Sequence, residues 1–245
     1  PFGKEKLSKQ LVKHHPILKK FKPAPGEKLF TELDTKQNKV FVVDYDMKQV
    51  EIIMLSKTDD YNPANIPVIS IFNEYFGSGM SSIVFQELRE AKGLAYSAYA
   101  RYSTPSRPDR AHHITTFIGT QNDKLPEALH GMSDLINNMP ESERSFLISR
   151  EAIEEKIRTE RITKTSILFN YERARKMGFQ EDIRKNIFNE VRQMEFPVLQ
   201  AFQEKYLKDR NYHILVLGKK DELDIDTLEK YGEIHYLTLE EIFGY

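Results

Sequence analysis

Several stretches of the chain carry the hydrophobic pattern of β-strands. Residues 39–45 and 50–58 are rich in β-branched side chains and are apolar on both faces, which predicts two well-buried strands. Residues 94–120 read as two strands separated by a loop with two prolines, which is typical of an antiparallel hairpin. A short apolar run at 212–218, closed by a glycine, predicts a buried final strand.

Most of the other hydrophobic positions follow helical spacing. Residues 62–77 have one apolar stripe, an asparagine that can cap the first turn and a proline suited to that turn. A shorter helix is expected from Ser81 or Ser82 to Lys92, and Gly93 stands where a left-handed C-terminal cap belongs. Further helices are predicted at 123–139, 141–164, 165–178, 180–190 and 195–208.

This order of elements predicts a single α+β domain over residues 31–245. Its sheet is expected to be mostly antiparallel, with the helices packed on one face. Residues 1–30 differ, because they carry many lysines, few acids and four prolines. We expect this segment to be a linker or strap whose lysines keep it solvated, and a basic arm for an anionic surface is the alternative.

Composition narrows the classes of partner. The 245 residues are 40% hydrophobic and 30% charged, which is typical of a soluble, folded chain. A net charge of -1 provides no overall electrostatic field that would attract nucleic acid, and no apolar run approaches the roughly 20 residues of a membrane span.

The chain begins at Pro1 without methionine, so we expect a piece of a longer protein. The compartment, periplasmic or cytoplasmic, stays open.

Several kinds of catalytic site are excluded by the residues themselves. Without cysteine there is no disulfide and no thiolate nucleophile or ligand. The histidines form two adjacent pairs, His14-His15 and His112-His113, and adjacent side chains on a strand or helix diverge too far to bind one ion. No His-x-x-Glu-His motif is present. The glycines around Ser78 follow a predicted helix, so they favour a turn over a phosphate loop. We therefore expect no metal site and no cofactor within this chain.

Arg89 and Tyr96 are the remaining candidates. Each has a structural explanation, since a cation is favoured in the last turn of a helix and tyrosine is common in strands. From the chemistry of the two residues alone, a structural role and a functional role both remain open. The surrounding segment, NEYFGSGMSSIVFQELREAKGLAYSAYARY at residues 73–102, is more specific.

That segment strongly resembles the non-catalytic half of the pitrilysin (insulinase-type, inverzincin) family of zinc peptidases. The order of elements agrees over 31–245, and the ending YLKDRNYHILVLGKKDEL is similar to the end of the family's domain. The resemblance implies the half-clamshell fold of the mitochondrial-processing-peptidase type. Two such halves face each other across a closed chamber, and one of them carries zinc on His-x-x-Glu-His.

The same resemblance implies roles for two residues. Arg89 matches the arginine of the family's "LRE" and Tyr96 the tyrosine of its "GLAY", and both are expected to face the scissile peptide as catalytic and substrate-binding residues. A phenol hydroxyl near the carbonyl oxygen would stabilise the charge that develops there. The arginine would hold substrate carbonyl groups or position the tyrosine.

Two functions follow from the resemblance, and a third does not depend on it. In the first, the chain is the substrate-binding C-terminal half of a zinc metalloendopeptidase that cleaves peptides. The N-terminal zinc-binding half then lies on the same polypeptide or a separate subunit. In the second, the chain is a non-catalytic, core-type subunit of a peptidase complex. A binding module unrelated to proteolysis is the third. The chain alone is predicted to be inactive, and in the first of these functions zinc is expected in the partner half.

Overall fold

The structure, a computed structural model, describes residues 3–15, 23, 25–26 and 32–244. The chain divides into two units, Pro1–Thr31 and Glu32–Tyr245. The described part of the first unit contains the helix α1 (Lys4–His14), none of whose residues is buried. The hydrophobic pattern did not predict this helix. The expected linker or strap over 1–30 lies partly outside the described residues and stays a prediction.

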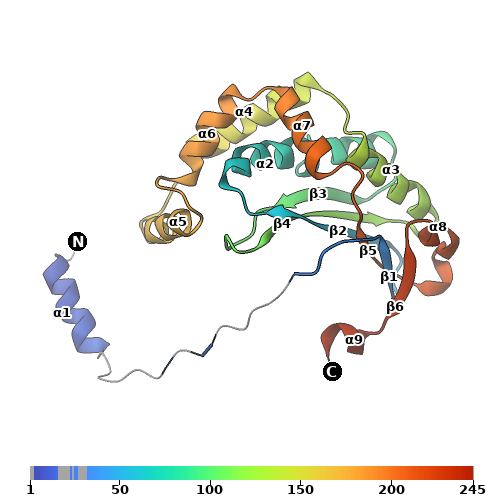
Figure 1. Cartoon of the computed structure of the whole chain (residues 1–245), viewed down its shortest axis with the longest axis horizontal. Helices are drawn as coiled ribbons and strands as arrows, with labels where there is room; N and C mark the ends of the chain where they lie inside the picture. The colour runs from blue at the N-terminus through green and yellow to red at the C-terminus, as the bar shows by residue number, and fades with distance from the viewer. Residues whose placement is uncertain (1–2, 16–22, 24, 27–31, 245) are drawn as a thin grey trace. The chain divides into compact units, whose positions relative to one another are not determined.

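The second unit is built on one six-stranded sheet. The strand order is β3-β4-β2-β5-β1-β6 (Figure 1). The pairs β3–β4, β4–β2 and β2–β5 are antiparallel, whereas β5–β1 and β1–β6 are parallel. The predicted α+β class with a mostly antiparallel sheet is therefore confirmed. The strands are β1 (Lys39–Asp44), β2 (Val50–Asp60), β3 (Ser97–Ser103), β4 (Ala111–Thr120), β5 (His213–Gly218) and β6 (Glu233–Leu237).

The buried strand predicted at residues 212–218 is confirmed as β5, but the prediction that it is the final strand was wrong. A sixth strand, β6, follows and pairs with β1 at the edge of the sheet. Its residues are exposed or half-buried, and Glu233 and His235 interrupt its apolar run. An edge strand of this kind lacks the hydrophobic pattern by which the inner strands are recognised. The inner strand β5 lies between β1 and β2, so these two do not pair with each other.

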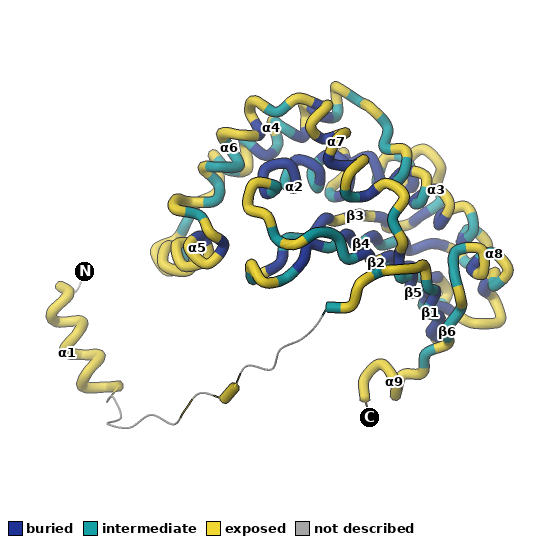
Figure 2. The backbone as a smooth tube through the Cα atoms, viewed as in Figure 1, coloured by how far each residue is buried: buried dark blue, intermediate teal, exposed yellow. Residues whose placement is uncertain are grey.

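The helices α2, α3, α4, α6 and α7 lie on one face of the sheet (Figure 1). Figure 2 shows the buried residues gathered between this layer and the strands. The predicted helices are confirmed with small shifts at their ends. The α-helices of this unit are α2 (Ile66–Phe72), α3 (Leu125–Asn137), α4 (Glu143–Thr159), α5 (Lys164–Lys176), α6 (Ile183–Gln193), α7 (Phe196–Tyr206), α8 (Ile225–Glu229) and α9 (Leu239–Phe243).

Short helical segments also lie between the helices and strands of this unit. Two are π-helices, η2 (Asn73–Gly77), which continues α2, and η3 (Phe85–Ala91), where the sequence predicted an α-helix. Single-turn π segments are rare and occur frequently at functional sites. The 3-10 helices are η1 (Pro63–Asn65), η4 (Asn122–Lys124) and η5 (Lys220–Glu222).

The helix η2 covers the free edge of β3. The side chain of Asn73 both donates to the Tyr102 carbonyl (3.0 Å) and accepts from the Tyr102 backbone N–H (2.8 Å). At the other end of η2, a Cβ on Gly77 would lie 1.9 Å from the carbonyl oxygen of Ala100. Glycine is therefore needed for η2 to approach the strand this closely. The contact fixes β3, at whose beginning the candidate site lies.

Candidate functional site

Arg89 lies on η3, a helix fixed to the core by its buried side. Leu88 is fully buried, and the N–H of Phe85 donates to the side chain of Ser82 at the start of the segment (3.4 Å). The wider π turn is closed by the bond from the Lys92 N–H to the Glu87 carbonyl (3.2 Å). With Leu88 facing inward, the side chain of Arg89 remains 44% exposed.

Tyr96 reaches the surface through a turn at Gly93. Gly93 adopts a positive φ of 58°, as the sequence predicted for the end of this helix. The N–H groups of Leu94 and Ala95 then both donate to the carbonyl of Leu88 (2.8 and 3.2 Å), which closes the helix end. The Tyr96 N–H joins β4 through the carbonyl of Gly119 (2.8 Å), and its side chain is 72% exposed.

The structure brings these two predicted residues together. The guanidinium carbon of Arg89 lies 5.8 Å from the centre of the Tyr96 ring and 4.8 Å from that of Phe85. These are distances at which a cation is attracted to an aromatic face. The Nε of Arg89 also lies 3.6 Å from a carboxylate oxygen of Glu90, an exposed pair that contributes little to stability.

Both polar groups are open to a ligand from outside. The Tyr96 hydroxyl has no hydrogen-bond partner among the residues that the structure describes, and its ring is the more exposed of the two side chains. A hydroxyl and a guanidinium on one rim can both donate to the oxygen of an approaching carbonyl group. The arrangement is therefore capable of binding a carbonyl and of stabilising negative charge on its oxygen.

The histidine pairs do not form a metal site. His112 is buried, with Nδ1 3.1 Å from the carbonyl of Ser103 and its ring stacked on Tyr61. His113 is half-buried, and burial lowers the pKa of its imidazole. Within the described parts of the chain, no group of three or more His, Asp or Glu side chains could hold a metal ion.

A cavity that the sequence did not reveal lies at the far end of β3. Its volume is about 380 Å³, and its walls come from α2, α5, α6 and the end of β3. The helix α5 projects beyond the helix layer at the ends of α4 and α6 (Figure 1), and only Ala174 on it is buried. Figure 2 shows the rest of α5 as mainly exposed.

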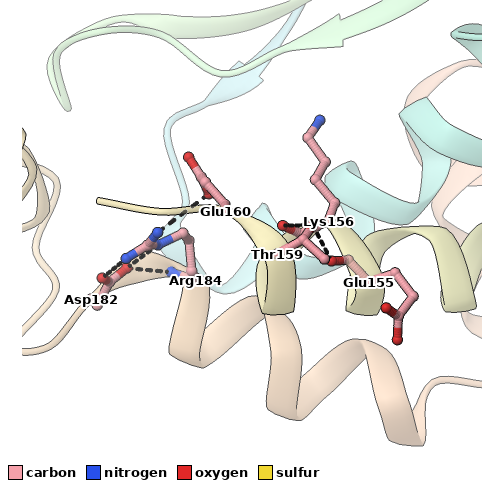
Figure 3. Close-up of polar contacts among 6 residues, drawn as sticks. All are labelled: Glu155, Lys156, Thr159, Glu160, Asp182 and Arg184. Atoms are coloured by element: carbon pink, nitrogen blue, oxygen red, sulfur yellow. Dashed lines mark hydrogen bonds and ion pairs between the residues drawn. The ribbon is translucent and has the colours of Figure 1, made fainter. Parts of the chain in front are cut away.

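An ion-pair cluster joins the two ends of the segment that contains α5. Arg184 on α6 donates from Nη1 to Glu160, directly after α4 (3.3 Å), and from Nε to Asp182 (3.0 Å), as Figure 3 shows. Asp182 also caps α6 by accepting from the Arg184 N–H (2.9 Å). The hydrogen bonds from Arg184 lower the pKa of the Asp182 carboxyl. We name Glu160, Asp182 and Arg184 the clasp.

None of the described helices is long and apolar enough to cross a lipid bilayer.

A family model and a curated protein match this chain. The family model, described as the peptidase M16 inactive domain, matches residues 4–158. An uncharacterized zinc protease from Streptomyces coelicolor is 33% identical over 91 residues, which cover 33% of this chain and 18% of that protein. The chain thus spans less than a fifth of this relative.

Solved structures share the fold. A protease from Helicobacter pylori superposes with a TM-score of 0.69 at 12% identity, over 89% of this chain and 53% of that one. A chain of complex III2 from Candida albicans gives 0.59 at 14% identity, over 94% of this chain and 57% of that one. The chain spans about half the length of these structures, and at such identities the similarity concerns the fold alone.

Proposed function

Because the chain belongs to the family of peptidase M16 inactive domains, we propose that it is the substrate-binding half of a zinc metalloendopeptidase. In this proposal the zinc site lies on an N-terminal half, on the same polypeptide or on a separate subunit. The present chain supplies Arg89 and Tyr96 to that site and has no metal of its own. The substrate is a peptide that lies between the two halves.

The observation that supports this proposal most directly is the shared, exposed position of Arg89 and Tyr96. Two side chains with purely internal roles would be expected to turn toward the core, yet Tyr96 is 72% exposed and Arg89 44%. The guanidinium lies over the tyrosine ring, where it helps to fix the orientation of that ring. The turn at Gly93, with its positive φ, places Tyr96 beside Arg89.

The chemistry assigned to this half is electrostatic. A zinc ion bound by the other half would provide an activated water as the nucleophile for the scissile carbonyl. The Tyr96 hydroxyl donates to the carbonyl oxygen as negative charge develops there, and Arg89 binds a neighbouring carbonyl or fixes the tyrosine. Loss of one such donor costs about 3–4 kcal/mol of transition-state stabilisation.

The test is Tyr96→Phe in the complete enzyme. We expect kcat to fall about 100- to 1000-fold while KM changes little, because the hydroxyl acts mainly in the transition state. Tyr45→Phe is a matched control, since Tyr45 is an exposed tyrosine directly after β1, which three strands separate from β3. Its kcat should stay within about twofold of wild type.

A core-type subunit without catalytic residues is the second candidate. The fold shared with a chain of complex III2 is the observation that favours it. This function predicts a stable complex whose turnover is unaffected by both Arg89→Ala and Tyr96→Phe. An unchanged kcat in the Tyr96→Phe enzyme would therefore favour the core-type subunit over the proposed peptidase half.

A further inference from the structure

A second cavity lies between α3 and the strands β2 and β5, on the face of the sheet that the helices cover. Its volume is about 150 Å³, the space of about five water molecules, so it suits a ligand of similar size. Three of its described lining residues, Met54, Ile136 and Ile214, are apolar and buried, and the others carry polar groups. We name it the small cavity.

The loop between α7 and β5 contributes Arg210 and Tyr212 to the lining of the small cavity. The side-chain oxygen of Asn38 accepts from the Tyr212 N–H (2.7 Å). The side-chain oxygen of Asn137, at the end of α3, accepts from the N–H of Asp209 (2.8 Å), which adopts a positive φ of 55°. Two side chains of the cavity lining therefore fix the backbone of this loop.

The Tyr212 hydroxyl is a buried polar group without a partner. Tyr212 is only 6% exposed, and its hydroxyl forms no hydrogen bond with the residues that the structure describes. The fully buried tyrosines Tyr75 and Tyr102, in contrast, both have hydrogen-bond partners. Buried polar groups in proteins are normally paired with protein, water or a ligand. The unpaired hydroxyl therefore indicates a group that binds in the cavity beside it.

Arg210 is the only charged residue among the described residues that line the small cavity. Its guanidinium donates to the carbonyl of Lys57 (2.7 Å) and to the hydroxyl of Ser56 (3.4 Å), and neither acceptor is charged. The positive charge lies near the Tyr212 phenol, where it partly offsets the rise that burial causes in the pKa of Tyr212. Arg210 forms no ion pair with a carboxylate in the described part of the chain, so its charge is available to an anion.

A monocarboxylate is the ligand whose chemistry matches these groups. A guanidinium and a phenol are both hydrogen-bond donors, and a carboxylate has two oxygens that accept from them. One cation neutralises one negative charge, whereas a phosphate dianion would keep a charge without a partner in a partly apolar cavity. The apolar lining residues suit a short hydrocarbon chain next to the carboxylate.

We propose that the small cavity binds a small monocarboxylate, which accepts hydrogen bonds from Arg210 and Tyr212. The carboxylate belongs either to a free short-chain acid or to the terminus of a peptide. The proposal does not depend on the proposed peptidase function, because neither Arg89 nor Tyr96 is among the described residues that line this cavity.

The test is an NMR titration of the nitrogen-15-labelled 245-residue chain at constant chloride concentration, which follows the backbone amide signals of residues 209–214. Butyrate is the free acid, and butyramide is its neutral counterpart. The tripeptide glycyl-glycyl-alanine and its C-terminal amide form the second pair. Binding of butyrate alone assigns the site to a free acid, and binding of the tripeptide acid assigns it to a peptide terminus.

We expect at least one of the two acids to bind with a Kd of about 1 mM, in keeping with its small size. The neutral amides should bind at least about tenfold more weakly, because they lack the charge. Arg210→Gln should weaken the acid about tenfold and Tyr212→Phe about fivefold. Two control variants should leave binding within about twofold: Lys208→Gln, an exposed cation of the same loop, and Tyr236→Phe, an exposed tyrosine of β6.

Three results would overturn the proposal: no saturable binding of either acid up to about 20 mM, equal binding of the neutral amides, or equal losses in Arg210→Gln and Lys208→Gln. Melting temperatures of the variants without ligand report whether the fold is kept. Tyr212→Phe should not lower the melting temperature, because the hydroxyl that it removes has no partner in the described part of the chain. Weaker binding in this variant therefore reports on the site and not on folding.

Discussion

At the scale of single residues, the candidate site depends on a reversal of the chain at Gly93. The positive φ there ends η3 and sends the next residues into β3, so that Arg89 and Tyr96 meet although seven positions separate them. The sequence indicated the turn, because glycine favours this conformation. It did not indicate the contact between the Arg89 guanidinium and the Tyr96 ring.

Tyr75 gives a pH-dependent prediction at this scale. Its ring is fully buried in η2, and its hydroxyl donates to the Pro140 carbonyl (2.7 Å) and accepts from the Ser142 N–H (3.0 Å). Burial raises the pKa of Tyr75 to about 12, against the opposing effect of the bond from Ser142. Because folding raises the pKa of Tyr75, its protonated side chain makes its full contribution to the free energy of unfolding below about pH 10. That contribution is lost as the pH rises toward 12 and the phenol ionises.

We expect Tyr75→Phe to lower the free energy of unfolding by about 1–2 kcal/mol at pH 8, because it leaves two backbone groups unpaired. Between pH 8 and pH 11 the difference from wild type should narrow by about 1 kcal/mol. Denaturant unfolding at both pH values measures this. Tyr45→Phe, at a 52% exposed position, serves as control and should show neither effect. A constant difference across the two pH values would contradict the assignment.

At the scale of elements, the close packing of η2 against β3 controls the edge of the sheet nearest the site. Exposed edge strands pair readily with other chains, and proteins commonly cover them. Here Asn73 satisfies the backbone of Tyr102, and Gly77 allows the helix to lie directly on Ala100. The strand edge of β3 is consequently not free at these positions.

Gly77→Ala tests this packing. The new Cβ would lie 1.9 Å from a backbone oxygen, so either η2 or β3 must move, and we expect a loss of about 3 kcal/mol or more. Gly119→Ala on the neighbouring strand is the matched control, since its Cβ would meet the Phe117 ring at 3.5 Å and the Ser97 carbonyl oxygen at 3.9 Å, both ordinary contact distances. Thermal unfolding of both variants would measure the loss, and equal melting temperatures would refute the packing argument.

The elements themselves were largely predictable, and the reasons for the exceptions are physical. In inner strands and in helices with one buried face, hydrophobic residues recur with a clear period, as in β5 and α3. The edge strand β6 has too many exposed positions for its hydrophobic residues to show such a period. The cavity depends on residues far apart in the chain, such as Tyr61 and Arg173, so no local pattern could identify it. Arg89 and Tyr96 were found because they lie within one recognisable segment.

At the scale of the whole molecule, the proposed function divides one active site between two halves. The described part of this chain has no cluster of His, Asp and Glu side chains suited to a metal, and zinc sites in proteins use three or four such ligands. In the proposed function, the part of this half is to hold and polarise the peptide.

We therefore expect the purified 245-residue chain to retain less than about 0.1 zinc per chain after exposure to the metal and gel filtration. It should also cleave no peptide on its own. Elemental analysis and a fluorogenic peptide assay measure the two quantities. Stoichiometric zinc together with peptidase activity in the isolated chain would refute the division of labour between halves.

The clasp has a consequence for how such a protein can diversify. The Arg184 guanidinium lies 3.3 Å from the Glu160 carboxylate, so the two ends of the segment between these residues lie close together. A stretch bounded in this way can be replaced by recombination with one of different length or composition while the hydrophobic interior stays as it is. Grafting residues 161–181 from a relative should then leave the hydrophobic interior of the unit folded as before.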